Sequence, residues 1–124
     1  MAETVLLVED EILIRMAAFQ HLEDCGYTVL QAANAAEALE ILKRYPQIDL
    51  VFTDVRMPGE MDGLGLAKWV IEHRPHIAVM IASGHAAKEN VLNELCGAHA
   101  FTKPYSFDDL TVRVREALQA RRPN

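Results

Sequence analysis

Five apolar runs along the chain have the length and composition of buried β-strands. Each run has five or six residues, which is too short for a helix, and consists mainly of aliphatic, β-branched or aromatic residues. Charged residues, proline or turn-forming residues bound the runs. The predicted strands are Thr4–Val8, Tyr27–Ala32, Ile48–Thr53, Ile77–Ala82 and Ala98–Thr102.

Helical patterns fill the segments between these runs. In the first segment apolar residues recur at spacings of three and four, and Gly26 follows as a C-terminal stop. The predicted apolar face of this helix consists of Ile12, Met16, Phe19 and Leu22. Asn34 and Glu37 form a capping-box pattern that begins a second helix. Further helices are predicted at Leu64–Glu72, at Lys88–Leu95 and after a Ser106 cap, the last burying Leu110, Val114, Ala117 and Leu118.

The alternation of strands and helices predicts one α/β domain over residues 1–124. Strand, helix, strand connections in one sheet are crossovers, which give parallel pairing with helices on both faces. We therefore expect a three-layer sandwich, with a five-stranded parallel sheet and five helices in the doubly wound, flavodoxin-like arrangement.

Composition and charge exclude several classes of protein. The formal net charge of the 124 residues is −6, which disfavours direct nucleic-acid binding because phosphate backbones require a positive surface. Cys25 and Cys96 lack the spacing of metal ligands, so neither a zinc site nor a disulfide scaffold is expected. No apolar run is long enough to span a membrane. We expect a cytoplasmic protein without a membrane anchor.

Chemically active residues stand where the predicted strands end. Glu9 and Asp10 follow the first strand, and Asp54, Ser83 and Lys103 follow or end the third, fourth and fifth. Ligands of open parallel sheets bind at the carboxyl ends of the strands, so these five side chains are expected to converge.

Three carboxylates at one sheet edge repel one another unless a cation lies between them. Hard oxygen ligands favour Mg²⁺, which binds through a few carboxylates and a phosphate. Asp54 is then the candidate nucleophile that accepts a phosphoryl group, while Ser83 and Lys103 could contact its oxygens.

Together these residues resemble the receiver domain of two-component response regulators, of the chemotaxis-regulator type. The resemblance spans the whole chain, with the family's motif elements in order and close to their usual spacing. These elements are Glu9-Asp10, Asp54, Met57-Pro58, Asp62-Gly63, Ser83-Gly84 and Lys103-Pro104-Tyr105.

The resemblance implies that a histidine kinase or phosphotransfer protein phosphorylates Asp54 in a Mg²⁺-dependent reaction. It implies that Asp10 binds the ion directly and that Glu9 acts through water. Asp54 and the backbone carbonyl of Arg56 would complete the protein ligands. On this hypothesis the chain is a phosphoacceptor and does not turn over external substrates.

The implied signal is a changed surface offered to a downstream protein. Ser83 would reorient toward the phosphoryl group and Lys103 would pair with it. In the family an aromatic residue three positions before the lysine commonly moves with them, but Ala100 stands here. Either Phe101 substitutes for that residue, or the face formed by helix four, strand five and helix five signals by another route. That face could also support a homodimer.

Several alternatives remain open. Asp10 or Asp54 could merely cap a helix, since aspartate is a preferred cap. Aspartyl-phosphate phosphatases also use a strand-end aspartate, but they usually carry a second acid where Arg56 stands. A module that keeps the fold without phosphorylation is a third alternative. His73 and His76 form an HxxH pair, although Pro75 lies between them and surface histidines are the better interpretation.

The sequence leaves open whether the chain is a free-standing regulator or a receiver cut from a longer protein. A receiver fold takes nearly all of the 124 residues, so we expect signalling through contacts with another protein. The donor, the downstream partner and the oligomeric state are likewise open.

Overall fold

Five strands form one parallel sheet in the order β2-β1-β3-β4-β5. The structure is a computed structural model that describes residues 2–55, 59–83, 98–102 and 106–120. Every predicted strand lies within two residues of an observed one. The strands are β1 (Thr4–Val8), β2 (Thr28–Ala32), β3 (Leu50–Asp54), β4 (Ala78–Ser83) and β5 (Ala98–Thr102).

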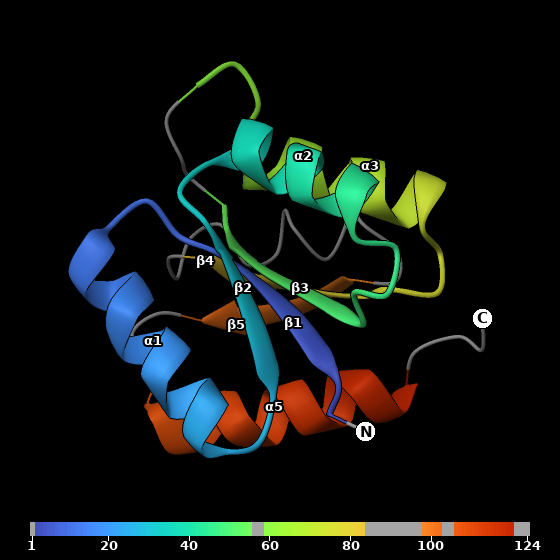
Figure 1. Cartoon of the computed structure of the whole chain (residues 1–124). Helices are drawn as coiled ribbons and strands as arrows, with labels where there is room; N and C mark the ends of the chain where they lie inside the picture. The colour runs from blue at the N-terminus through green and yellow to red at the C-terminus, as the bar shows by residue number, and fades with distance from the viewer. Residues whose placement is uncertain (1, 56–58, 84–97, 103–105, 121–124) are drawn as a thin grey trace.

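Helices cover both faces of this sheet. In Figure 1, α2 and α3 lie on one face, and α1 and α5 lie on the other. The predicted helix at Lys88–Leu95 falls outside the described residues, within which four helices are present. These are α1 (Ile12–Asp24), α2 (Ala35–Arg44), α3 (Gly63–His73) and α5 (Phe107–Ala120). The parallel sheet and its strand order confirm the predicted α/β, flavodoxin-like arrangement.

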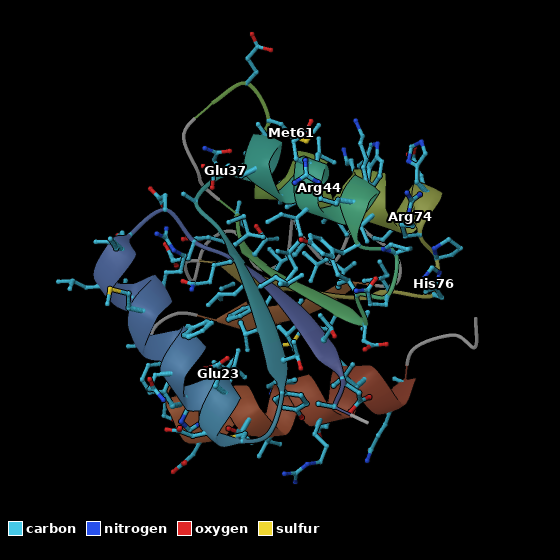
Figure 2. The ribbon with its side chains drawn as sticks, viewed as in Figure 1. Glu23, Glu37, Arg44, Met61, Arg74 and His76 are labelled. Atoms are coloured by element: carbon cyan, nitrogen blue, oxygen red, sulfur yellow. The ribbon has the colours of Figure 1, made fainter. Side chains whose placement is uncertain are left out.

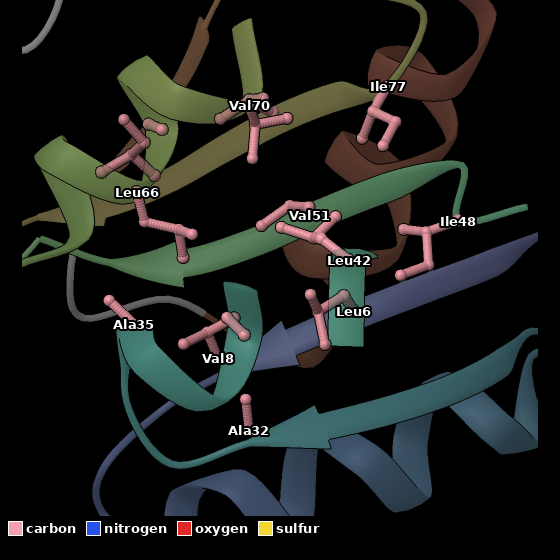
Figure 3. Close-up of a cluster of buried hydrophobic side chains, with 14 of the residues drawn as sticks. Leu6, Val8, Ala32, Ala35, Leu42, Ile48, Val51, Leu66, Val70 and Ile77 are labelled. Carbon is pink, nitrogen blue, oxygen red and sulfur yellow. The ribbon is translucent and has the colours of Figure 1, made fainter. Parts of the chain in front are cut away.

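Each face of the sheet has its own hydrophobic core, and Figure 2 shows side chains filling the layers between the sheet and its helices. Side chains alternate along a strand, so in β1 Leu6 and Val8 point to one face while Val5 and Leu7 point to the other. Figure 3 shows the first cluster, in which Leu6 and Val8 lie among Leu42, Val51 and other residues from α2, α3 and the strands. The second cluster packs beneath α1 and α5. Burial on both faces explains why the strands are continuous apolar runs.

The helix α5 matches its predicted pattern. The Ser106 hydroxyl accepts a 3.0 Å hydrogen bond from the Asp109 N–H, which caps the first turn. Its buried face consists of the four predicted residues, Leu110, Val114, Ala117 and Leu118. Sequence periodicity therefore identified both the start of α5 and the face that it buries.

The predicted apolar face of α1 is partly wrong. Ile12 is 59% exposed and Met16 is 57% exposed, while Leu22 and Ala18 are the buried residues of this helix. α1 runs opposite to β1, so its first turn lies at the carboxyl edge of the sheet, and Ala18 and Leu22 lie further along, over the sheet. Periodicity correctly predicted a helix, but it could not show how much of that helix the sheet covers.

Candidate functional site

Three carboxylates meet where β1 and β3 end. The two strands are neighbours in parallel register, with Val8 paired to Thr53, so the residues that follow this pair lie at the same edge. These residues are Glu9 and Asp54, and Asp10 is next along the chain. Ligand oxygens of all three lie within 4.8 Å of one another. The prediction that these acids converge is therefore confirmed.

The three acids differ in their exposure to water. Asp10 is exposed and Asp54 is half-buried, whereas Glu9 is only 5% exposed. A buried carboxylate needs polar partners, and one Glu9 carboxylate oxygen accepts the Glu11 N–H at 3.1 Å. Glu9, Thr53 and Asp54 also line a small pocket beside the cluster. The cluster is therefore buried at Glu9 and open to solvent at Asp10.

The main chain that follows Asp54 is held on two sides. The Val55 N–H donates to the Ala82 carbonyl at 3.0 Å, and the Gly63 N–H donates to the Val55 carbonyl at 2.8 Å. A Cβ atom at Gly63 would overlap the backbone carbonyl of Asp54. Glycine at the start of α3 therefore permits a close approach that any side chain would prevent.

The helix-cap alternative for Asp10 and Asp54 is wrong. Glu11 occupies the N-cap position of α1. At α3 the N-cap is Asp62, whose carboxylate accepts the Gly65 N–H at 2.9 Å. Asp54 is the last residue of β3. Helix capping therefore does not explain why these two acids stand where they do.

Ser83 is placed by the sheet register. It ends β4, one residue beyond Ala82, which pairs with Asp54 on β3. On its other side Ser83 pairs with Thr102 of β5. The remaining predicted site residues, Lys103 and Arg56, lie outside the described residues.

Arg15 is a site neighbour that the sequence interpretation did not single out. Its guanidinium Nη1 donates a hydrogen bond of 2.8 Å to the backbone carbonyl of Glu9. The sequence signal was weak, because a single arginine on a helix is usually a solvated surface residue. Only its place, one helical turn after Glu11, could have suggested the contact.

The HxxH pair has a structural role at His73. The His73 ring stacks on Trp69 at 4.6 Å between centroids, and its Nδ1–H donates to the Trp69 carbonyl at 2.9 Å. Trp69 packs against the core. Within the described parts of the chain, the acid cluster is the one group of three residues that could hold a metal ion.

The sequence profile of the response regulator receiver domain matches residues 5–115. The chain belongs to this family. Receiver domains of two-component systems accept a phosphoryl group on an aspartate as their general function, and they bind Mg²⁺ at an acidic pocket. The oxygen donors of this receiver domain fit that ion, because carboxylates are the protein ligands that Mg²⁺ prefers.

Relatives of this receiver domain include much longer proteins. It is 40% identical over 119 residues to the sensor kinase CckA of Brucella abortus, covering 94% of the chain and 12% of the kinase. It is 34% identical over 119 residues to the aerobic respiration control protein ArcA of Escherichia coli, covering 92% of the chain and 48% of that protein. The receiver domain thus spans less than half the length of these curated relatives.

A solved structure of similar length matches closely. It is a response regulator receiver protein from Sinorhizobium medicae, with a TM-score of 0.88, 33% identity and 98% of each chain covered. The two chains therefore share a fold over nearly their whole length. In the part of the receiver domain that the structure describes, no helix has the length and apolar character needed to cross a membrane.

Proposed function

We propose that Asp54 is the phosphoacceptor of this receiver domain and that Glu9, Asp10 and Asp54 hold Mg²⁺. The observation that carries this proposal is the convergence of three carboxylates, with ligand oxygens within 4.8 Å of one another, at the ends of β1 and β3. Neither Asp10 nor Asp54 is the N-cap of the helix that follows it. Of the three, only Asp54 belongs to a strand, and its half-buried side chain is more accessible than that of Glu9, so it is the acid best placed for attack on phosphorus.

The phosphoryl transfer uses the carboxylate of Asp54 as the nucleophile. One of its oxygens attacks phosphorus, the bond from phosphorus to the donor's imidazole nitrogen breaks, and the imidazole leaves as a neutral ring that keeps the proton on its other nitrogen. Bound Mg²⁺ neutralises negative charge on the phosphoryl oxygens. Asp10 would bind the ion directly, and Glu9 would hold it through a bound water. Later attack by water on the aspartyl phosphate releases inorganic phosphate and restores the carboxylate.

The remaining site residues complete the proposal from the family resemblance. On that resemblance the backbone carbonyl of Arg56 would supply a further metal ligand, Ser83 would contact a phosphoryl oxygen, and Lys103 would pair with another. The position of Ser83, one residue beyond the partner of Asp54 in the sheet, supports its role. The second acid of aspartyl-phosphate phosphatases is absent from the sequence, where Arg56 stands instead.

The donor is a histidine kinase or phosphotransfer protein that docks beside the acids. Ile12, Leu13 and Met16 are 59%, 79% and 57% exposed on the first turns of α1, which follows Asp10. Adjacent exposed apolar side chains commonly mark protein contacts. A donor that covered this turn would bring its phosphorylated imidazole to the edge of the sheet that carries Asp54.

The proposed output is a changed surface for a downstream protein, without turnover of external substrates. The proposal includes one receiver domain over residues 1–124 in the cytoplasm, together with the helix that the sequence predicts at Lys88–Leu95. The face formed by the proposed helix at Lys88–Leu95 together with β5 and α5 is the proposed signalling surface and a proposed homodimer contact.

Labelling with a small phosphodonor tests the phosphoacceptor. The chain is incubated with Mg²⁺ and acetyl phosphate, and intact mass is expected to show one added phosphoryl group. Asp54→Asn removes the nucleophilic oxygen and should abolish the addition, as should EDTA. Asp24→Asn, at the exposed end of α1, is the matched control and should be labelled normally. Unchanged labelling of Asp54→Asn would disprove the assignment.

A further inference from the structure

Arg15 joins α1 to the loop that carries two of the three acids. Its guanidinium Nη1 donates to the Glu9 carbonyl at 2.8 Å in a partly buried position. Its backbone N–H donates to the Glu11 carbonyl at 2.9 Å. We propose that Arg15 is a positioning residue for Mg²⁺ binding, which orients Glu9 and Asp10 and rests on the function proposed above.

The bond from Arg15 acts on the peptide unit between the two acids. The Glu9 carbonyl belongs to the planar group that links Glu9 to Asp10, so fixing its direction fixes the geometry from which both side chains project. Two other hydrogen bonds hold this loop. The Glu9 N–H donates to the Ala32 carbonyl at 3.0 Å, and the Glu11 N–H donates to the Glu9 carboxylate at 3.1 Å. Arg15 is thus a third attachment of this loop, and it acts on the linking peptide itself.

The start of α1 depends on this attachment because its N-cap supplies no side-chain bond. Glu11 makes no side-chain cap, and the first turn carries no acidic residue. The starts of α2 and α3, by contrast, are held by the side chains of Asn34 and Asp62. At α1 a side chain from within the helix reaches back to the loop instead, which couples the position of the helix to that of the acids.

The charge of Arg15 and its hydrogen bond have opposite effects on a cation. A guanidinium has only donors and stays protonated, so it cannot itself bind Mg²⁺. Its positive charge disfavours a second cation nearby, whereas its hydrogen bond holds the acids in place for one. If positioning dominates, removing Arg15 weakens Mg²⁺ binding. If charge dominates, the same change strengthens it.

Titration of Mg²⁺ alone into the full chain by calorimetry separates these effects. Arg15→Met keeps much of the apolar stem and removes the donor, and its Mg²⁺ dissociation constant should rise about tenfold, as for other residues that orient metal ligands. Arg15→Lys keeps the charge and one donor and should fall between Arg15→Met and the wild type. Arg44→Met removes the same charge from the exposed end of α2 and should bind Mg²⁺ like the wild type.

A second measurement excludes a merely structural role. Labelling of Asp54 is followed at rising Mg²⁺ concentration, and in Arg15→Met the midpoint should shift by the same factor while the plateau rate matches the wild type. Wild-type or tighter Mg²⁺ binding by Arg15→Met would overturn the inference. If Arg15→Met does not fold, Arg15→Lys provides the test instead. Wild-type Mg²⁺ affinity in Arg15→Lys would then overturn the inference.

Failure of the proposed function would look different. In that case the wild-type chain itself would bind no Mg²⁺, or Asp54→Asn would still be labelled. A wild-type chain that binds Mg²⁺ and is labelled on Asp54, beside an Arg15→Met variant with unchanged affinity, would overturn only the role of Arg15.

Discussion

The helices that follow the neighbouring strands β1 and β2 begin in opposite ways. At α2 the Asn34 side chain accepts the Glu37 N–H at 2.9 Å, and the Glu37 carboxylate accepts the Ala33 N–H at 2.8 Å. At α1 the N-cap Glu11 makes no side-chain cap, and Leu13 in the first turn is 79% exposed. The start of α2 is thus capped by side chains at that helix start, whereas the uncapped start of α1 lies beside the acid cluster.

The two helix starts also differ in how much they contribute to the hydrophobic core. The buried residues of α2, Ala35, Ala38 and Leu42, begin at its first residue. Those of α1 begin only at Ala18, in its second turn. The first turn of α1 therefore contributes little to the core, and its apolar side chains are exposed beside the acid cluster. Three experiments test this contrast, and a fourth tests the partly buried phenol of Tyr27.

Truncating a leucine should have very different effects in the two helices. Leu42 of α2 is 1% exposed within the core, so Leu42→Ala should lower the free energy of unfolding by about 3 kcal/mol. Leu13→Ala on α1 should change it by less than about 0.5 kcal/mol. Urea unfolding followed by circular dichroism measures both. Equal losses would mean that the start of α1 also belongs to the core.

The exposed turn of α1 should matter to phosphotransfer from a protein donor. Leu13→Ser removes an apolar contact at the proposed docking surface, and transfer from the cognate phosphorylated donor should slow about tenfold, equivalent to 1.4 kcal/mol of binding. Labelling by acetyl phosphate should not change. Val112→Ser on α5, where Val112 is 50% exposed, is the matched control. Equal slowing by both variants would place docking elsewhere.

The helix caps should differ by a smaller amount. Asn34→Ala removes the side-chain acceptor at α2 and should cost about 1 kcal/mol of unfolding free energy. Glu11→Ala at α1 removes no cap bond and should cost less than about 0.5 kcal/mol. Thermal unfolding of the two variants compares them directly. A larger loss for Glu11→Ala would show that its carboxylate supports the site in another way.

Tyr27, between α1 and β2, should give the smallest effect. Burial raises the pKa of its phenol above the ordinary 10.0, and the Glu3 carboxylate acts in the same direction. As pH rises, Tyr27 therefore ionises in the unfolded chain before it does so in the folded one. Its contribution to the free energy of unfolding is fully present below pH 10.0 and is lost as pH rises through the folded pKa. Tyr27→Phe should flatten this alkaline fall in urea titrations. An identical fall in the variant would assign it to other groups.

Much of the fold was predictable because burial on both faces leaves a strong local signal. The Asn34–Glu37 cap and the inward face of α5 were also correct, since both depend on neighbours within one helix. The exposure of Ile12 was not predictable, because it depends on where α1 lies relative to the end of the sheet.

The acids of the site were predictable for a topological reason. Parallel strands end at one edge, so Glu9, Asp10 and Asp54 had to approach one another once the strands were recognised. Arg15 was not predictable, because its bond to the Glu9 carbonyl depends on the path of a loop and on a rotamer. Sequence patterns thus placed the three acids together, while the contacts of the loop that carries Glu9 and Asp10 required coordinates.

The close approach of Gly63 to Asp54 limits how this site could be transplanted or redesigned. Because a Cβ atom at position 63 would overlap the Asp54 carbonyl, an engineer who copied only the acids into another α/β scaffold would lack the space that they need. The smallest transferable unit would include the glycine and the first turn of α3. In a saturation library, position 63 should therefore tolerate fewer substitutions than Asp62 beside it, although Asp62 supplies the visible cap.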